Sequence, residues 1–219
     1  MGYLKIVTSL SAAAFLMVGC SNQTPEEQIH EHLEEAVSLE ETFQEQQQPL
    51  QELEAEEKEI YNEIIEMDAE QLDEIQEQSN EAAEIVQERK ELIDTEKESI
   101  DEAKEEFDEI ESPVEDLESD EAQKEANQLI ETMDKRYEAY NSLNEAYQAA
   151  LSLDSELYEM MQDEDLAKDD LQAKVDEINE SYNEVIEAND EFNEFTKEYN
   201  EQKKSFYEST DLEINYDES

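Results

Sequence analysis

The chain has very little glycine and cysteine, and both shortages exclude common kinds of functional site. Gly2 and Gly19 are its two glycines among 219 residues, so no glycine follows residue 19. Phosphate-binding loops, nucleophile elbows and dinucleotide-binding motifs need glycine for their tight turns, and enzymes built on these motifs are therefore disfavoured. Cys20 is the single cysteine, so no disulfide can form within the chain.

Basic residues are also scarce. The chain carries 14 Lys and Arg residues against 67 Asp and Glu residues, which gives a formal net charge of −53. Nucleic acid is excluded as a partner, because binding to phosphate backbones requires a basic surface. Taken alone, such an acidic composition is typical of disordered chains, which bury too little apolar surface to fold.

Regular apolar spacing nevertheless predicts folded helices. Along three stretches, side chains recur at alternating intervals of three and four residues, which places them on one side of a helix that needs a facing helix. These stripes are Ile100, Ala103, Phe107, Ile110, Val114 and Leu117; Leu129, Met133, Arg136, Tyr140, Leu143, Tyr147, Ala150, Asp154, Leu157 and Met161; and Leu171, Val175, Ile178, Tyr182, Val185, Asn189, Phe192, Thr196, Tyr199, Lys203 and Phe206. Because the alternation typical of strands is absent, we predict an all-α fold.

Helix start signals divide the chain into four segments of similar length. Thr24 and Ser112 each precede a proline and stand three residues before a glutamate, which is the pattern of a capped helix start. A polar run between Met161 and Leu171 predicts a loop, and Pro49 should kink the first segment or split it in two. We therefore predict an elongated antiparallel bundle of about four long helices, with segments at residues 25–66, 69–111, 113–161 and 168–209. A three-helix bundle with residues 25–66 held loosely is the alternative architecture.

The first 20 residues have the features of a bacterial export signal. Lys5 supplies the positive charge and Ile6–Val18 the apolar run, which is too short to cross a bilayer. The end of that run, Met17-Val18-Gly19-Cys20, resembles the lipobox, whose cysteine is joined to diacylglycerol and becomes the first residue of the mature protein. A buried thiol is the alternative role for Cys20. We expect a signal peptide at residues 1–19, a lipidated tether at 20–24, a helical bundle domain at 25–209 and a flexible acidic tail at 210–219.

The sequence predicts neither a metal site nor a catalytic site. Glu27 and His30 form one E-x-x-H piece, but di-iron bundles need a second piece on another helix. His32 points away from His30 on a helix, so we expect both histidines to be solvated. No hydroxyl, imidazole and carboxylate have the spacing of a nucleophilic relay. We therefore predict no enzyme, and no cofactor apart from the diacylglycerol and acyl lipid on Cys20.

Polar and aromatic side chains in the last two segments are the candidate ligand contacts. Tyrosine and asparagine surfaces can stack on sugars and hydrogen-bond to their hydroxyls, although core packing is the plainer role for most of these rings. Charged or amide groups at stripe positions cost stability, and they are more consistent with setting helix register than with binding a ligand. The candidates for a polar seam or for ligand contacts are Arg136, Tyr140, Asp154, Asn189, Asn193 and Tyr199.

Three stretches resemble the cell-wall-binding lipoproteins of Bacillus-type Gram-positive bacteria. They are Thr132–Tyr140, Leu153–Tyr158 and Phe192–Asn200, and together with the lipobox the resemblance extends over most of the chain. It implies a lipid-anchored helical protein outside the membrane, and it implies no reaction.

We therefore expect a non-catalytic protein held by lipid on the extracytoplasmic face of the cell membrane, with peptidoglycan or an envelope protein as its partner. The alternative is a membrane-tethered coiled-coil scaffold, or a self-associating protein, without affinity for glycans. The sequence leaves the ligand, the oligomeric state and the pairing order of the helices open.

Overall fold

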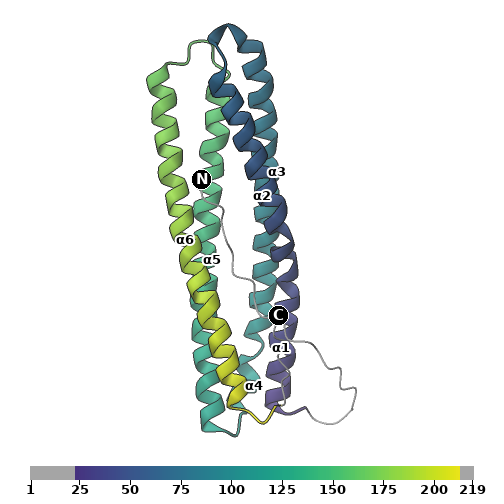
Figure 1. Ribbon diagram of the computed structural model, residues 1–219. Coiled ribbons are helices and arrows are strands. Elements are labelled where there is room, and N and C mark those ends of the chain that lie inside the picture. Colours follow the sequence, from purple (N-terminus) through teal and green to yellow (C-terminus); the bar gives the residue numbers. More distant parts are fainter. Residues whose placement is uncertain (1–22, 213–219) are drawn as a thin grey trace. The chain divides into compact units, whose positions relative to one another are not determined.

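A computed structural model of the chain describes residues 23–212, which form helices and no strand (Figure 1). The predicted all-α bundle of four long helical stretches is confirmed. None of the helices in this part of the chain is long and apolar enough to cross a membrane. The elements are α1 (Pro25–Leu39), α2 (Glu41–Glu66), the 3-10 turn η1 (Ala69–Gln71), α3 (Leu72–Asp108), α4 (Glu111–Glu115), α5 (Asp120–Met160) and α6 (Lys168–Glu208).

Helix α1 begins where the capping pattern predicts. The N–H of Glu27 donates to Thr24 Oγ1 at 3.3 Å, and the N–H of Thr24 donates to Glu27 Oε2 at 3.0 Å. Pro25 occupies the first turn, where its missing N–H costs nothing. Two of the unpaired donors at this helix end are therefore satisfied by neighbouring side chains.

The third long helix begins later than predicted. Pro113, expected at its start, lies instead in the short helix α4, and α5 begins at Asp120. Val114 and Leu117 are both buried in this connection, so the chain turns to cover the core before α5 starts. The N–H of Ala122 donates to Ser119 Oγ at 3.2 Å, so Ser119, and not Ser112, caps the long helix.

The first segment is divided, but at Glu40 and not at Pro49. Pro49 lies inside the continuous helix α2, whereas Glu40 separates α1 from α2. The N–H of Glu40 still donates to the carbonyl groups of Ala36 and Val37, each at 3.2 Å. The interruption therefore keeps its backbone hydrogen bonds, and it falls at a buried carboxylate, since Glu40 is 5 % exposed.

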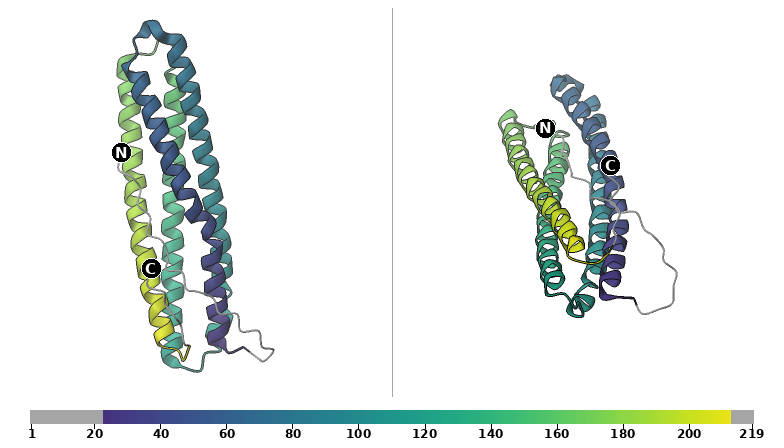
Figure 2. Two further views of the ribbon diagram at one scale, coloured as in Figure 1. Left: turned by 45° about the vertical axis from the view of Figure 1, so that its right-hand side comes forward. Right: turned by 60° about the horizontal axis from the view of Figure 1, so that its bottom comes forward.

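The helices divide between two compact units. Of the described residues, unit 1 contains 45–97 and 141–189, and unit 2 contains 23–44, 98–140 and 190–212. Each unit thus holds one portion of each of the four helical stretches. Within unit 1, α2 runs beside α3 and α5 runs beside α6 (Figure 2). Hydrogen bonds from Gln78 to Glu63 at 2.9 Å and from Lys174 to Glu156 at 2.8 Å join these two helix pairs.

The predicted stripes form the buried faces of the helices. Every member of the first stripe and every member of the second is buried, including the polar Arg136 and Asp154. The third stripe is buried from Val185 to Phe206, but Leu171, Val175 and Tyr182 nearer its start are only half-buried. The periodicity therefore predicts the core correctly, and the half-buried stretch marks a place where packing on α6 is incomplete.

Glu40 and Arg136, the second of which is a stripe position, form an ion pair inside the aromatic core of unit 2. The guanidinium of Arg136 donates to both carboxylate oxygens of Glu40, at 2.7 and 2.8 Å, and to Thr196 Oγ1 at 3.1 Å. Its Cζ atom lies 5.0 Å from the ring centre of Phe192 and 5.7 Å from that of Tyr199. The bidentate geometry and the stacked rings satisfy a charge that would otherwise be costly to bury.

Substitution of Arg136 by Met should destabilise the protein strongly. The change leaves the buried carboxylate of Glu40 without its cation, which costs about 3–5 kcal/mol and lowers the melting temperature by about 10 °C in a chain of this size. The double substitution Arg136→Met with Glu40→Leu should recover most of this loss. Thermal unfolding followed by circular dichroism measures both variants, and Lys135→Met, an exposed neighbour with the same change of charge, is the control. A single variant as stable as the control would contradict the role given to this pair.

Glu96 is a buried carboxyl without a cationic partner among its described contacts. It is 6 % exposed on α3 and accepts a hydrogen bond from the side-chain amide of Gln47. Burial, and then the charge of Glu54, raise the pKa of Glu96 to about 8. Because this folded-state pKa lies above the ordinary value of 4.5, the stability penalty is present above pH 8 and disappears as the pH falls toward 4.5.

The melting temperature should therefore rise as the pH falls from 9 to about 5.5. Glu96→Gln removes one cause of this trend, so at pH 9 it should raise the melting temperature by about 5 °C, with little effect at pH 5.5. The exposed Glu81→Gln is the matched control, since it changes the net charge equally. Equal gains from both variants at pH 9 would assign the effect to general charge repulsion and not to burial of Glu96.

Candidate functional site

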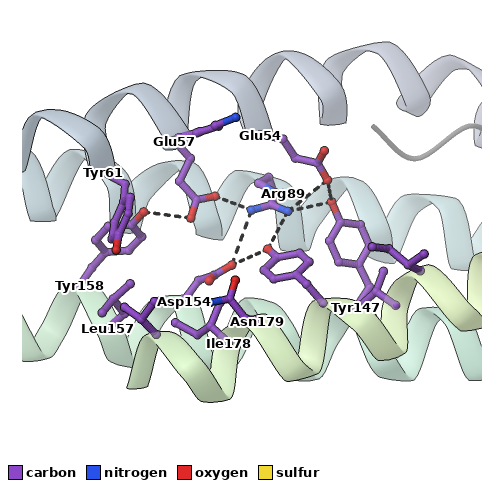
Figure 3. Close-up of a pocket in the computed structure, with 15 residues that line it drawn as sticks. Glu54, Glu57, Tyr61, Arg89, Tyr147, Asp154, Leu157, Tyr158, Ile178 and Asn179 are labelled. Carbon is purple, nitrogen blue, oxygen red and sulfur yellow. Dashed lines mark hydrogen bonds and ion pairs between the residues drawn. The ribbon is translucent and has the colours of Figure 1, made fainter. Parts of the chain in front are cut away.

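The side chain of Arg89 lies at the centre of a polar cluster inside unit 1. Arg89 comes from α3 and is 2 % exposed. Its guanidinium pairs with the carboxylate of Glu57 and, at 3.3 Å, with that of Glu54, both on α2 (Figure 3). On the α5 side, Asp154 Oδ2 lies 3.7 Å from Arg89 Nη1. One guanidinium is therefore shared by three carboxylates.

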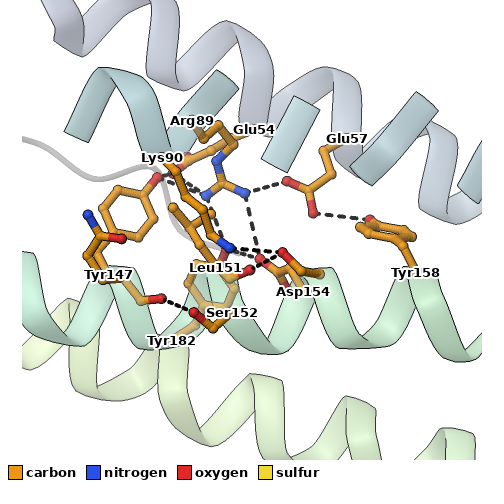
Figure 4. Close-up of polar contacts among 12 residues, drawn as sticks. Glu54, Glu57, Arg89, Lys90, Tyr147, Leu151, Ser152, Asp154, Tyr158 and Tyr182 are labelled. Atoms are coloured by element: carbon orange, nitrogen blue, oxygen red, sulfur yellow. Dashed lines mark hydrogen bonds and ion pairs between the residues drawn. The ribbon is translucent and has the colours of Figure 1, made fainter. Parts of the chain in front are cut away.

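Tyrosine hydroxyls connect the guanidinium to the carboxylates. Arg89 Nη2 donates to the hydroxyl of Tyr147 at 2.8 Å and to that of Tyr182 at 3.0 Å (Figure 4). The Tyr147 hydroxyl in turn donates to Glu54, and the Tyr182 hydroxyl donates to Asp154 Oδ2 at 2.5 Å. The Tyr147 ring also lies under the guanidinium, with its centre 5.3 Å from Cζ. Helices α2, α3, α5 and α6 all contribute to the cluster.

The third carboxylate also receives a phenolic hydrogen bond. The Tyr158 hydroxyl donates to Glu57 Oε1 at 3.1 Å. Each of the three carboxylates around Arg89 therefore accepts from one tyrosine as well as facing the guanidinium. Outside this ring of contacts, Lys90 Nζ donates to Ser155 Oγ at 3.0 Å.

Two of the three carboxylates around Arg89, those of Glu57 and Asp154, are buried, and the pKa values of both are raised. Burial, and then the charge of Glu57, raise the pKa of Asp154 to about 7, although Arg89 and Lys90 oppose this shift. Burial also raises the pKa of Glu57, against the opposing effect of Arg89. Burial is thus the main cause of both shifts, and the charge of Arg89 offsets it only in part.

A cavity of about 130 Å³ lies beside this cluster. Leu157, Ile178 and Val185 supply apolar wall, whereas Lys58 and Asn179 on the same lining are exposed to solvent. Val175 and Tyr182, which are half-buried residues of the third stripe, also line the cavity. Its full lining is Glu54, Glu57, Lys58, Tyr61, Arg89, Tyr147, Asp154, Leu157, Tyr158, Val175, Ile178, Asn179, Tyr182, Val185 and Ile186.

The guanidinium keeps one unused donor. Its Nε is buried and has no hydrogen-bond partner among residues 23–212. The other nitrogens bond to carboxylates and phenols that are themselves engaged. The arrangement offers aromatic faces and carboxylates around an accessible space, which suits binding of a ligand better than activation of a nucleophile.

The predicted contact residues fall in both units. Arg136 and Tyr199 are brought together in unit 2. The centre of the Tyr140 ring lies 5.5 Å from that of Phe192, at a tilted angle, and Phe192 also contacts Arg136. Asp154 lies in the Arg89 cluster of unit 1. The two asparagines differ in exposure, since Asn189 in unit 1 is buried and Asn193 in unit 2 is half-buried.

Arg89 and Glu57 were not predicted from the sequence, although the same periodicity contains a signal for Arg89. Extending the first stripe back from Ile100, in steps of four and three, passes through Glu96, Ile93 and Arg89. All three are buried. A charged residue on a core stripe therefore indicates a buried polar cluster, and Arg89 meets this rule as Arg136 does.

Both histidines were expected to be solvated, but each has a side-chain partner. His30 Nδ1 lies 2.9 Å from the Tyr207 hydroxyl, and His32 Nδ1 lies 2.6 Å from Glu106 Oε1. Both rings are half-buried. Within the described range, no group of three or more His, Cys, Asp and Glu side chains is arranged to hold a metal ion.

A crystal structure of a conserved protein of unknown function from Staphylococcus aureus has the same fold. The two structures superpose with a TM-score of 0.74, over 86% of this chain and 98% of that one, at 15% sequence identity. At this identity the likeness concerns the fold alone.

Sequence comparison gives the family. An uncharacterized lipoprotein of Bacillus subtilis (strain 168), YkyA, is 37% identical over 59 residues, which are 27% of this chain and 26% of that protein. The chain thus matches about a quarter of the length of this relative. Residues 24–209 match a family described as "Putative cell-wall binding lipoprotein", called YkyA, so most of the chain is covered. The chain belongs to the YkyA family.

Proposed function

We propose that this protein is a non-catalytic lipoprotein, anchored through Cys20 on the outer face of the cytoplasmic membrane, whose helical units bind the cell wall or an envelope partner. The family match over residues 24–209 carries the proposal. It begins four residues after Cys20, so the family region starts close to the predicted anchor. Both compact units fall within it.

The anchor is supported by the sequence before the described residues. Met17-Val18-Gly19-Cys20 lies outside the described residues and is proposed from its pattern alone. Each buried methylene of a lipid chain stabilises membrane attachment by about 0.8 kcal/mol, so one acyl chain binds marginally and two or more bind stably. A diacylglycerol-modified cysteine would therefore hold the helical units at the membrane surface.

Lipid attachment should depend on the Cys20 thiol. In a Gram-positive host grown with radiolabelled palmitate, the wild-type chain should take up label and fractionate with membranes. Cys20→Ser should lose the label and be released into the medium or remain as the unprocessed precursor. Label retained by Cys20→Ser would contradict the proposed anchor, and expression of both forms is checked by immunoblot.

Binding to the wall has to overcome the charge of the protein. With a net charge of −53, the protein is repelled by the anionic polymers of a Gram-positive wall. Two routes remain: bridging by divalent cations, or contact with the sugar strands and peptides of peptidoglycan. Intact walls and walls stripped of anionic polymers distinguish these routes.

We expect residues 20–219 with Cys20→Ser to sediment with purified peptidoglycan. Retention on stripped walls without magnesium would indicate direct contact with peptidoglycan, because no anionic polymer is left to repel the protein. Retention on intact walls should increase with magnesium if cations form the bridge. Release from both kinds of wall in both conditions would refute wall binding, and sedimentation of the protein alone tests self-association as the competing explanation.

A further inference from the structure

The cavity beside Arg89 has apolar walls next to a charged cluster. Leu157, Ile178 and Val185 on the apolar wall are buried. The polar side consists of the carboxylates, phenols and guanidinium of the cluster, and Glu57 and Asp154 there are 7 % and 4 % exposed. A ligand that fits must therefore have an apolar body and a polar or charged group.

Exposed apolar side chains lie on two of the helices that carry the lining. Among the described residues, Ile65 on α2 and Ile186 on α6 are the large apolar side chains that stay exposed, at 52 % and 40 %. Ile186 lines the cavity. Ile65 follows the lining residue Tyr61 by four positions and so shares its helix face. In a surface otherwise dominated by carboxylates, this exposed apolar area is a candidate for covering by a ligand.

The charge of the lining favours a cation. With all three carboxyl groups ionised its formal charge is −1, because Glu54, Glu57 and Asp154 outnumber Arg89 and Lys58. The terminal nitrogens of Arg89 are already engaged by carboxylates and phenols. An anion entering the cavity would meet three carboxylates, whereas a cation would relieve their repulsion.

Aromatic faces strengthen this preference. Tyr61, Tyr147, Tyr158 and Tyr182 all line the cavity. The Tyr147 and Tyr182 rings meet edge to face, with their centres 6.4 Å apart. Tyrosine faces attract ammonium groups, and the attraction grows when water is excluded. Carboxylates together with several aromatic rings are the usual composition of a site for an organic ammonium ion.

We propose that the cavity beside Arg89 binds a small amphipathic cation, an ammonium group carried on a short apolar or aromatic body. The ammonium group lies among the tyrosine rings and the carboxylates of Glu54 and Asp154, and the body packs against Ile178 and Val185. An apolar cavity of about 150 Å³ admits a benzene ring, so the space of about 130 Å³ beside Arg89 suits a body of that size. Neither the lipid on Cys20 nor wall binding enters this proposal, so it stands or fails independently of the proposed function.

Three probes of the same shape and different charge test the proposal on an otherwise unaltered protein. Benzylammonium, benzyl alcohol and benzoate are titrated into residues 20–219 carrying Cys20→Ser, a form that retains every described residue. Salt near the physiological level screens diffuse attraction to the acidic surface. Calorimetry gives the affinities, and the tyrosine ring resonances locate the bound probe.

We expect benzylammonium to bind saturably and about tenfold more tightly than benzyl alcohol, and benzoate not to bind. The resonances of the four lining tyrosines should shift, whereas those of Tyr199 and Tyr207 in unit 2 should not. Equal affinity for the alcohol, binding of benzoate, or no saturable binding of benzylammonium would each overturn the proposal.

Variants separate the cavity from general electrostatic attraction. Lys58→Gln removes a competing cation from the lining and should strengthen benzylammonium binding about threefold, whereas Lys135→Gln in unit 2, with the same change of charge, should not. Glu54→Gln should weaken binding about tenfold, and the exposed Glu81→Gln should leave it unchanged. Equal effects of the lysine variants would overturn the site. Because Lys58 is exposed, this comparison decides the question even if Glu54→Gln fails to fold by circular dichroism.

Discussion

The charge of the Arg89 guanidinium, shared among the buried carboxylates of Glu57 and Asp154 and the half-buried one of Glu54, is the constraint on which unit 1 depends. A lone carboxylate in such a place would be very costly to bury, and three of them would repel one another strongly. The guanidinium pairs with Glu57 and Glu54 and approaches Asp154, while Tyr147, Tyr158 and Tyr182 each donate one hydroxyl to this set. Apart from Arg89 Nε, these polar groups are therefore paired, yet one cation faces three carboxylates. This imbalance determines what kind of ligand the adjoining cavity can accept.

Both units contain a buried arginine paired with carboxylate groups, but the number of carboxylates and the space beside the pair differ. In unit 2, Arg136 bonds to both oxygens of Glu40 and packs on the Phe192 ring. One cation there meets one anion, and the space enclosed around the pair is close to 0 Å³. In unit 1, one cation meets three anions beside a cavity of about 130 Å³. Buried ion pairs cost stability unless they are closely complemented, so the pair in unit 2 is consistent with setting register, and the cluster in unit 1 is consistent with binding.

Much of the fold could be predicted from sequence because the apolar spacing is regular. All the residues of the first two stripes are buried, and the start of α1 follows from the capping pattern at Thr24. Rules for helix starts and breaks that use only the local sequence failed where packing between helices determines the structure. Ser112 and Pro113 satisfy the rule for a helix start, but burial of Val114 and Leu117 turns the chain first. Pro49 satisfies the rule for a break, yet α2 continues through it.

The candidate site was only partly predictable. Asp154 was singled out because it is polar on an apolar stripe, and it does belong to the cluster. Arg89 obeys the same rule, since it lies on the backward extension of the first stripe, whereas no stripe indicated Glu57. A cavity depends on how side chains from four helices fit together, and neither composition nor spacing contains that information. The incomplete burial of Val175 and Tyr182 beside the cavity likewise becomes known only from the folded structure.

Membership of a family described as "Putative cell-wall binding lipoprotein" is consistent with a place at the cell envelope, while the charge of unit 1 bears on what the chain binds. The claim that Arg89 under-compensates its carboxylates is most directly tested by the pH titration of the Asp154 side-chain carboxyl carbon, followed by nuclear magnetic resonance. The account predicts a midpoint of about 7 for this carboxyl. A midpoint near the ordinary value of 3.8 would mean that the guanidinium compensates the cluster fully, and it would contradict the account.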